Sequence, residues 1–468
     1  MSNRLFIPTA RVPATTLAAI RRGLTLANPK ANRRLRPDTP PAPATIHCYD
    51  ETYNTLIAPR AAATTIMRAL VDAGLPAHLH TAFCRPSAPP LTRRADFPLF
   101  AYQERAVAAV LAVGGGIVEV PCGGGKTVIG MEVAARACTP TLWLCHTTDL
   151  ARQALGVARD LYGLHGDNLG FIGDGSWQPG SRLTVAMLQS LRDRNLTTLA
   201  NSIGCLVLDE AHHAPADSFR AVVEAFPARL RLGLTATPER QDHLEAWMHL
   251  VFGPTTYRTT YRELADAGRI VLPDVGFVLT GVGSEHHAPE PTDHWTDAVS
   301  YLAASPARNR LILALLAQCV AEGRRCLVLT NLVKHADLLA QALQAVGVPT
   351  LPLVGKLSPK KRAATIDGFR SGHIRAIVAT SLADEGLDLP ELDTVLLASP
   401  ARSGGRIAQR IGRVMRVHPD KQTPLVIDLV DEHGLYRHQA TGRWAQYREL
   451  GARILPKGSI VAPALAAS

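Results

Sequence analysis

The sequence predicts an α/β protein with two domains, each built on a parallel β-sheet, preceded by a small basic N-terminal accessory domain. Short apolar runs of strand length alternate with helix-length segments in two series, and roughly 80 residues without this alternation separate the series. The first 94 residues lack the alternation and carry most of the net charge. These observations together predict the fold class.

The apolar runs are the expected strands of the two sheets. The first series comprises residues 116–120, 141–145, 183–188, 205–210 and 231–237, and the second comprises 325–330, 350–355, 374–380, 394–399 and 424–430. Nearly continuous apolar strands joined by helices are typical of parallel sheets that are covered on both faces. We therefore expect a basic domain at 1–94, a first α/β domain at 95–256, a connecting segment at 257–305, a second α/β domain at 306–454 and a C-terminal tail at 455–468.

The basic domain differs in composition from the rest of the chain. Residues 1–94 contain 13 Lys and Arg against 4 Asp and Glu, which places +9 of the net charge of +10 there. Residues 45–60 predict two strands around a polar Asp-Glu turn, 61–73 predict a helix, and 85–90 form a Pro-rich linker. Such a basic segment favours binding to nucleic acid or to an acidic surface, although a solvated arginine-rich face explains the charge equally well.

Composition argues against several classes of protein. Apolar residues make up 47% and charged residues 19% of the 468 residues, which is ordinary for a chain with a large core. We find no apolar run of the roughly 18 residues that a membrane span needs, and no signal peptide. The eight cysteines lack CxxC spacing, which favours reduced thiols over disulfides or a zinc site. We expect a cytoplasmic protein encoded by a bacterium or phage, with no membrane partner.

The strongest local pattern is the phosphate loop, VPCGGGKT at 120–127, between an expected strand and an expected helix. Its glycines let backbone amides turn toward an anion, and the helix N-terminus adds its dipole. Lys126 would reach the β- and γ-phosphates of ATP, and Thr127 would bind Mg²⁺. Val120 stands where the usual pattern has its first glycine. The predicted ATP-binding residues of the loop are Pro121, Cys122, Gly123, Gly124, Gly125, Lys126 and Thr127.

The choice of lysine supports this interpretation. Only 8 of the 50 basic residues are lysine, and Lys126 is the only one between Lys30 and Lys334. A compact ammonium group, not a guanidinium, is what a phosphate loop requires.

A second pattern, CLVLDEAHH at 205–213, places two carboxylates at the end of an expected strand. In a parallel sheet the strand ends meet at one edge, so Asp209 and Glu210 would lie beside the phosphate loop. Asp209 would hold Mg²⁺, and Glu210 would orient and deprotonate the attacking water.

With these residues in place, the motifs resemble those of superfamily 2 helicases, in the branch of XPB-like proteins and the helicase subunits of restriction enzymes. Tyr102-Gln103 resembles the glutamine motif that reads adenine, and the cysteine of PCGGGKT is similar to that of XPB-like loops. The segments 144–153 and 184–191 resemble motifs that grip one DNA strand. DEAHHAPADSFR at 209–220 resembles the DEAH box, and LTATPERQD at 234–242 resembles the Thr-Ala-Thr coupling motif, with Gln241 where XPB-like proteins have Glu.

The expected second domain continues the resemblance, which covers about residues 97–430. Residues 326–340, 378–390 and 409–416 resemble helicase motifs IV, V and VI. Arg410, Arg413 and Arg416 recur every three residues and so share one face of a helix, which a solvated basic face would explain as well.

The resemblance implies two tandem RecA-like domains, with ATP and Mg²⁺ as cofactors. The implied catalytic residues are Lys126, Asp209, Glu210, Arg413 and Arg416, of which the two arginines would act as fingers on the γ-phosphate. Further implied nucleotide contacts are Gln103, Gly386 and Asp388, and the implied coupling residues are His212, Thr235, Thr237 and Gln409. The implied nucleic-acid contacts are Thr147, Arg152, Gln189, Thr330 and Thr380.

Together these features predict an ATP-dependent DNA helicase, or a translocase on single-stranded, duplex or branched DNA, that acts in repair, recombination or fork remodelling. Two alternatives stay open: the motor subunit of a restriction or defence complex that works with a nuclease or repair partner, and an RNA helicase. A nucleotide-dependent interaction module without motor activity is disfavoured, because both carboxylates and the arginines are present.

Overall fold

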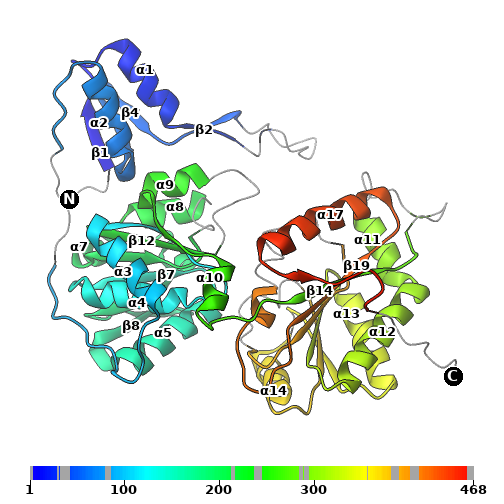
Figure 1. Cartoon of the computed structure of the whole chain (residues 1–468). Helices are drawn as coiled ribbons and strands as arrows, with labels where there is room; N and C mark the ends of the chain where they lie inside the picture. The colour runs from blue at the N-terminus through cyan, green and yellow to red at the C-terminus, as the bar shows by residue number, and fades with distance from the viewer. Residues whose placement is uncertain are drawn as a thin grey trace. The chain divides into compact units, whose positions relative to one another are not determined.

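The computed structural model describes residues 4–28, 31, 43–79, 86–211, 217–236, 245–283, 288, 295–355, 357–380, 389–400 and 411–460. The chain forms two compact units, each with one large β-sheet (Figure 1). The first unit comprises 1–120 and 125–259, and the second comprises 260–468, with which residues 121–124 are grouped.

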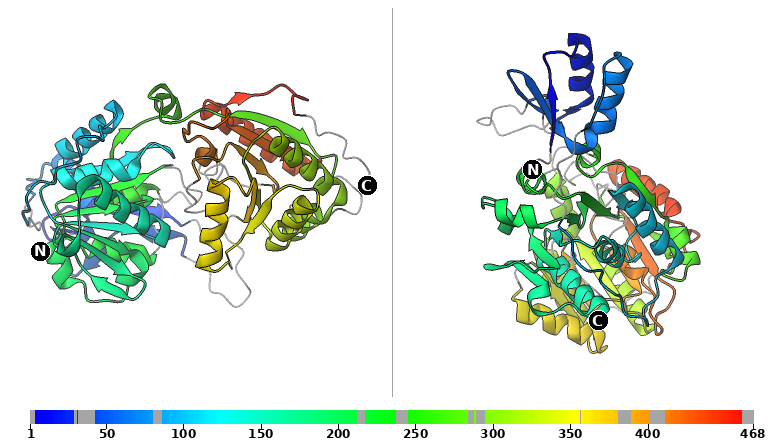
Figure 2. Two further views of the ribbon diagram at one scale, coloured as in Figure 1. Left: turned by 90° about the horizontal axis from the view of Figure 1, so that it is seen from below. Right: turned by 90° about the vertical axis from the view of Figure 1, so that its left-hand side faces the viewer.

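The first unit begins with two small antiparallel sheets and two helices. The sheets are built from β1 (Arg4–Pro8), β5 (Thr55–Pro59) and β4 (Asp50–Thr52), and from β2 (Thr25–Ala27) and β3 (Thr45–His47). Helix α1 (Ala14–Gly23) contacts α2 (Ala63–Asp72), which follows the short turn η1 (Arg60–Ala62), as the right-hand view of Figure 2 shows. These strands and helices enclose a small core of Ile7, Ile20, Leu24, Leu56, Ala58, Ala62 and Ile66.

The predicted Asp-Glu turn in this region is wrong, whereas the helix predicted at 61–73 is confirmed as α2. Asp50 and Glu51 lie within β4, and the turn follows at residues 53–54. Arg4 forms an ion pair with Asp50, and Arg21 Nε lies 2.8 Å from Glu51 Oε1. Because arginines pair with both carboxylates, charged residues that are typical of a turn continue the strand here.

The amino-terminal elements are anchored to the α/β part of the same unit. Arg4 donates a hydrogen bond to Glu224 (2.6 Å), and Arg60 donates one to the carbonyl oxygen of Ala228. Cys48 is buried in the hydrophobic core of the α/β part. Residues 4–72 therefore have a small core of their own but belong to the first compact unit instead of forming a separate one.

The large sheet of the first unit has the strand order β13-β6-β12-β11-β7-β10-β8-β9 and is parallel except for the β8–β9 hairpin. Its strands are β6 (Gly115–Glu119), β7 (Thr141–Cys145), β8 (Leu169–Gly173), β9 (Ser176–Gln178), β10 (Leu183–Met187), β11 (Cys205–Leu208), β12 (Leu230–Thr235) and β13 (Thr255–Arg258). The five predicted strands of the first series are confirmed as the adjacent strands at the centre. The strands that were not predicted lie toward the edges, where β9 and β13 are partly exposed and carry a weaker apolar pattern.

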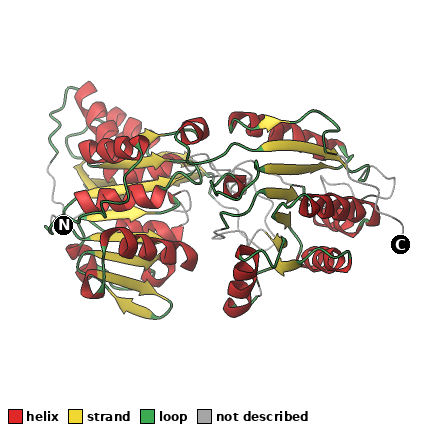
Figure 3. Cartoon of the chain, turned by 60° about the horizontal axis from the view of Figure 1, so that its bottom comes forward, coloured by secondary structure: helices red, strands yellow, loops and turns green. Residues whose placement is uncertain are grey.

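Helices cover this sheet, as Figure 3 shows. They are α3 (Ala101–Val113), α4 (Lys126–Arg136), α5 (Thr148–Tyr162), α6 (Leu188–Leu191), α7 (Thr197–Ser202), α8 (Asp217–Glu224) and α9 (Glu245–Phe252). Gly130 lets α4 approach the sheet closely, because a Cβ atom there would lie 2.7 Å from the indole of Trp143 and 2.8 Å from Leu234. This glycine costs the helix about 1 kcal/mol relative to alanine, which the close packing offsets.

The second unit has a seven-stranded, fully parallel sheet in the order β16-β17-β15-β18-β19-β14-β20. Its strands are β14 (Asp274–Leu279), β15 (Cys326–Thr330), β16 (Thr350–Leu353), β17 (Ala376–Thr380), β18 (Thr394–Leu397), β19 (Leu425–Val430) and β20 (Arg453–Ile454). Its helices are α10 (Tyr261–Asp266), α11 (Trp295–Ala304), α12 (Pro306–Ala321), α13 (Val333–Ala345), α14 (Pro359–Arg370) and α17 (Gly434–Glu449). The predicted fold class of two parallel-sheet α/β domains is confirmed.

Two predicted boundaries differ from the structure. The expected connecting segment 257–305 contributes β14, which lies between β19 and β20 inside the second sheet. The expected tail also packs against this sheet: Leu455 donates to the carbonyl oxygen of Val275 (2.8 Å), and Ile460 contacts Gly276. Strand pairing across about 150 residues has no local signal in the sequence. The pattern of apolar runs therefore indicated neither β14 nor the packing of residues 455–460 against the sheet.

The described residues include seven of the cysteines, all of them free thiols. Searching the same residues, we find no helix with the length and apolar character of a membrane span, and no group of three or more His, Cys, Asp or Glu that could hold a metal ion.

Candidate functional site

The phosphate loop joins the buried strand β6 to helix α4. Gly123 and Gly125 have φ angles of 86° and 72°, in the left-handed region that favours glycine. Gly125 is the N-cap of α4, so the loop leads directly into a helix N-terminus. Pro121, Cys122 and Gly124 complete the turn, in which Gly124 N–H donates to the carbonyl oxygen of Pro121 (3.1 Å). This arrangement is suited to binding an anion through backbone amides.

Gln103 lies beside this loop. Its Oε1 atom accepts a hydrogen bond from the backbone N–H of Phe100 (3.0 Å), which closes the first turn of α3. A Cβ atom at position 125 would lie 2.7 Å from Gln103 Nε2, so the glycine is required both for its φ angle and for this close approach. The structure therefore places the predicted adenine-reading side chain against the phosphate loop, where it is 2% exposed.

The three predicted charged groups meet at the carboxyl edge of the sheet. Lys126 Nζ lies 3.4 Å from Glu210 Oε1. Asp209 is 3% exposed, and its Oδ1 accepts a hydrogen bond from the backbone N–H of Glu210 (3.0 Å). Burial and the neighbouring Glu210 carboxylate raise the pKa of Asp209 to about 7, against the opposing effect of Lys126. Further positive charge at this position would favour the ionised carboxylate.

Glu210 has a strained backbone. Its φ angle is 51°, in the left-handed region that residues with a Cβ atom rarely occupy. Such a conformation costs about 1–3 kcal/mol and is typical of functional sites, where the surrounding structure holds it. Here it follows the end of β11 and places the Glu210 carboxylate beside the Lys126 ammonium group.

Thr127 and Thr235 are two further hydroxyl residues of this edge. Thr127 is the second residue of α4, and Thr235 is the last residue of β12 and fully buried. The carbonyl oxygen of Thr235 accepts a hydrogen bond from Val120 N–H (3.0 Å), so the start of the phosphate loop is tied to the next strand. The hydroxyl of Thr127 and the carboxylate of Asp209 are oxygen ligands of the type that Mg²⁺ prefers, and the raised pKa of Asp209 fits a carboxylate that a cation stabilises.

Two predicted nucleic-acid contacts also meet at this edge. Thr147 follows β7, and its hydroxyl accepts from Leu150 N–H (3.4 Å) as the N-cap of α5. Gln189 follows the neighbouring strand β10, and its amide donates to the carbonyl oxygen of His146 (2.9 Å). Arg152 lies one helical turn further along α5 and pairs with Asp149 (3.0 Å), with its side chain 70% exposed.

The predicted contacts in the second unit are placed differently. Thr330 is 1% exposed, and its hydroxyl bonds to His335 Nδ1 (2.8 Å) and lies 3.2 Å from Ser399 Oγ. Thr380 is also buried. Both side chains are thus enclosed at the strand ends, and the expectation that backbone amides and hydroxyls around Thr330 and Thr380 hold phosphates stays a prediction. The Ser399 hydroxyl also accepts a hydrogen bond from the backbone N–H of Asn331 (3.0 Å). Thr330 therefore supports, through Ser399, the turn that follows β15.

Arg413 and Arg416 lie in the second unit. Arg413 is part of a short helical segment and is half-buried. Burial lowers the pKa of Arg416 from its ordinary value. The carbonyl oxygen of Arg416 accepts a hydrogen bond from Lys421 Nζ (2.8 Å), which also lies 3.4 Å from the carbonyl oxygen of Pro390 and so joins the segments of motifs V and VI. His212, Thr237, Gly386, Asp388 and Gln409 lie outside the described residues.

A buried polar network in the second unit was not predicted. Arg308 and Asp431, each with a side chain that is 1% exposed, form an ion pair of 2.8 Å. Arg308 also donates to the carbonyl oxygen of Ala398 (2.7 Å), and Thr280 donates to Asp431 (2.7 Å). Asn309 follows Arg308 in the sequence, and its Oδ1 atom lies 3.0 Å from His335 Nε2. Burial lowers the pKa of His335 to about 4. The sequence pattern gives no indication that residues this far apart are in contact.

The parallel sheet, the glycine-rich loop before a helix and the paired carboxylates define a protein of the P-loop class with two α/β domains. The family model "Type III restriction enzyme, res subunit" matches residues 96–240, and "Helicase conserved C-terminal domain" matches residues 307–418. The chain belongs to the superfamily 2 helicases, in the branch of XPB-like proteins and restriction-enzyme helicase subunits.

Several known proteins are similar to this chain. "DNA 3'-5' helicase XPB" of Kineococcus radiotolerans is 30% identical over 68% of this chain and 57% of its own. "DNA 3'-5' translocase XPB2" of Sulfurisphaera tokodaii is 26% identical over 70% of this chain and 80% of its own. The solved structure of Dbp5 of S. cerevisiae bound to RNA and ADP BeF3 superposes with a TM-score of 0.56 at 16% identity, over 80% of this chain and 90% of that one. The chain spans 64% and 57% of the lengths of two of the curated relatives it matches.

Proposed function

We propose that the protein is an ATP-dependent helicase or translocase that moves on DNA. The observation that carries this proposal is the set of groups at the carboxyl edge of the first large sheet. Lys126 and Glu210 are in contact, Asp209 is buried beside them, and the phosphate loop turns into the N-terminus of α4. On the same edge, Thr147 and Gln189 follow two neighbouring strands, within the segments that resemble strand-gripping motifs.

In the proposed reaction, ATP binds to the phosphate loop through Lys126 and backbone amides. Thr127 and Asp209 would hold Mg²⁺, which neutralises the developing charge on the phosphates. Glu210 would take the proton of the attacking water, and its carboxylate oxygen lies 3.4 Å from the Lys126 ammonium group. A cation bound at the buried Asp209 carboxyl would favour its ionised form.

We further propose that Arg413 and Arg416 stabilise the γ-phosphate in the transition state. Both belong to the second unit, whereas Lys126, Asp209 and Glu210 belong to the first. Arginine fingers contribute about 10³–10⁵ to the rate of hydrolysis. When they come from another domain, hydrolysis depends on domain closure, and the cycle of closing and opening becomes a step along the strand.

The choice of DNA as the track is supported by the names of the XPB-like relatives, which are described as DNA 3'-5' helicases or translocases. A second candidate function is the motor of a restriction or defence complex, because the matching model of the first unit is that of a type III restriction subunit. Co-purification with a nuclease or methylase subunit from the native host distinguishes this candidate from a motor that acts alone.

The proposal is tested by steady-state ATPase assays of the full chain with single-stranded, duplex, forked and Holliday-junction DNA and with RNA. We expect stimulation by at least one DNA substrate that exceeds stimulation by RNA of matched length. Equal or greater stimulation by RNA contradicts the choice of track, and turnover that no nucleic acid changes contradicts the motor function itself.

The charge of residues 1–94 leads to a separate prediction about affinity. Arg11, Arg22 and Arg68 are exposed on the amino-terminal elements. If this surface binds phosphates, replacing the three with glutamine should lower the affinity for DNA and reduce the slope of log K against log salt by up to about 2–3. The matched control replaces three exposed arginines elsewhere, Arg159, Arg310 and Arg370. Equal salt slopes for the two triple variants would refute a special role of the amino-terminal arginines.

A further inference from the structure

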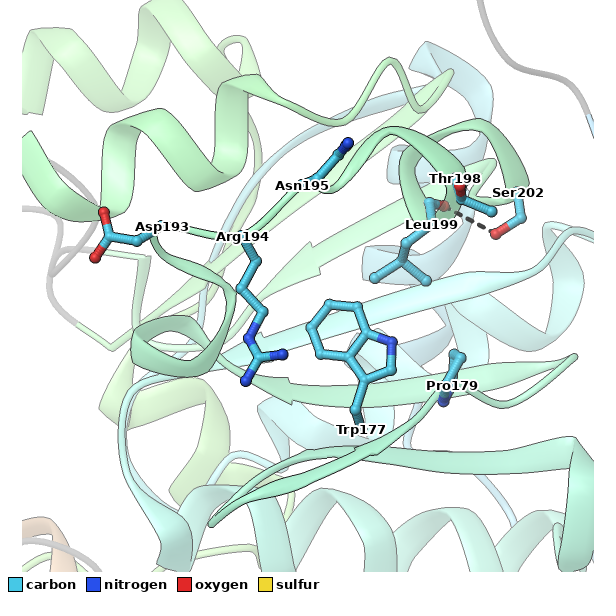
Figure 4. Close-up of a pocket in the computed structure, with 8 residues that line it drawn as sticks. All are labelled: Trp177, Pro179, Asp193, Arg194, Asn195, Thr198, Leu199 and Ser202. Atoms are coloured by element: carbon cyan, nitrogen blue, oxygen red, sulfur yellow. Dashed lines mark hydrogen bonds between the residues drawn. The ribbon is translucent and has the colours of Figure 1, made fainter.

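A pocket of about 700 Å³ lies beside β9, the edge strand of the first large sheet. Its residues follow the phosphate loop by about 50 or more positions in the sequence. It is lined by Trp177 and Pro179 from the edge of the sheet and by residues of the loop and helix that follow β10, namely Asp193, Arg194, Asn195, Thr198, Leu199 and Ser202 (Figure 4). None of these residues lies in a segment that resembles a helicase motif.

The chemistry of the pocket is that of an aromatic platform with one basic group. Trp177 is 38% exposed although it is a large apolar side chain. The guanidinium carbon of Arg194 lies 5.1 Å from the centroid of the indole ring, a cation–π distance. Figure 4 shows Arg194 reaching back toward the indole while Asp193 points away from it. Pro179 and Leu199 add apolar surface, and Thr198 and Ser202 line the same cavity.

The backbone holds this arrangement in place. Asp193 has a φ angle of 63°, in the left-handed region, and this turn directs the chain from α6 into the loop that carries Arg194. Asn195 Oδ1 accepts a hydrogen bond from Thr197 N–H (3.0 Å), which fixes the start of α7. The Ser202 hydroxyl donates to the carbonyl oxygen of Leu199 (2.8 Å) within α7. The platform is therefore formed before any ligand binds, which reduces the entropic cost of binding.

The position of the pocket indicates which ligand it takes. Gln189, whose amide bonds to the backbone beside Thr147, precedes the pocket loop by a single turn of α6. The loop that lines the pocket thus begins beside a proposed nucleic-acid contact. An exposed indole stacks on any nucleobase, because every base has a π-face, and an arginine beside it can stack on the base or contact the adjoining phosphate.

We propose that this pocket binds an unstacked base of the single-stranded nucleic acid on which the protein moves. The inference rests on the proposed function, which it deepens by naming a base-binding subsite outside the helicase motifs. Trp177 supplies the stacking surface, and Arg194 positions the ring and adds positive charge. The subsite would contribute affinity that depends on the presence of a base and is tolerant of its identity.

The test is oligonucleotide binding by fluorescence anisotropy with the full chain. Trp177→Ala is expected to weaken the binding of a single-stranded oligothymidylate about 5- to 20-fold, and Trp177→Phe, which keeps an aromatic ring, to weaken it less than about threefold. The matched control is Trp444→Ala. Trp444 is 40% exposed and carries Arg448 at 4.9 Å from its ring, but it lies on α17 of the second unit.

A second arm separates base stacking from phosphate contact. The wild-type chain should bind an oligonucleotide with abasic sites more weakly than the matched intact strand, and Trp177→Ala should lose most of that difference. ATPase activity without nucleic acid should be equal in all variants. The subsite is refuted, while the proposed function stands, if the affinity of Trp177→Ala for the oligonucleotide equals that of Trp444→Ala. It is likewise refuted if Trp177→Ala shows the same difference in affinity between the intact and the abasic strand as the wild-type chain. If the wild-type chain neither binds nucleic acid nor responds to it, both are refuted.

Discussion

Replacement of Lys126 with alanine is expected to reduce nucleic-acid-stimulated ATP hydrolysis by at least about 100-fold, because removal of one preorganised charge at a reacting phosphate typically costs 10²–10³ in rate. Lys126 begins α4, and its ammonium group contacts the Glu210 carboxylate. The substitution therefore removes the cation that would bind the phosphates and also leaves the two carboxyl groups without their positive neighbour. The measurement is kcat for ATP hydrolysis with saturating DNA.

Two further variants show whether the loss has the proposed cause. Lys126→Arg keeps the charge but replaces a compact ammonium with a planar fork, so we expect it to lose most of the activity as well. Glu210→Gln removes the proposed base with little change in shape and should lower kcat by about 10²–10⁴ without abolishing nucleotide binding. Lys361→Ala changes an exposed lysine of α14, outside the segments that resemble helicase motifs, and serves as the control. DNA-stimulated turnover near the wild-type rate in Lys126→Ala or Glu210→Gln would exclude the assigned roles.

The second large effect is expected on stability. Asp431→Ala should lower the free energy of unfolding of the second unit by about 3–5 kcal/mol, because it leaves the Arg308 guanidinium buried without its carboxylate. Arg308 is enclosed between α12 and the ends of two strands, where it also donates to the carbonyl oxygen of Ala398. A loss of this size is a large part of the 5–15 kcal/mol that is typical of a domain. Urea unfolding followed by circular dichroism measures it.

The control for this prediction is an exposed ion pair on the same sheet. Asp274 pairs with Arg453, whose side chain is 73% exposed, so Asp274→Ala should cost less than about 1 kcal/mol. The double variant Arg308→Met, Asp431→Leu removes both charges and should recover much of the loss seen in Asp431→Ala. If Asp431→Ala and Asp274→Ala unfold at the same urea concentration, the buried pair does not have the importance assigned to it.

Local patterns account for the parts of the site that were predicted. The phosphate loop was found because glycines and a lysine must follow one another between a strand and a helix, and the structure shows the φ angles and the helix start that this pattern requires. Asp209 and Glu210 were found because an apolar run ends in them. The central strands of both predicted series were found because they are buried on both faces and therefore read as continuous apolar runs.

The sequence by itself thus determined the class of fold, the order of the central strands along the chain and the residues of the proposed ATP site. Only the tertiary structure decided which distant groups meet. It placed β14 between β19 and β20, joined Arg308 to Asp431 across 123 positions, enclosed the Thr330 hydroxyl and set Arg194 over Trp177. The physical reason is that hydrophobic periodicity and turn chemistry act over a few residues. Pairing across a sheet depends instead on how whole elements pack, which no short stretch of one sequence encodes.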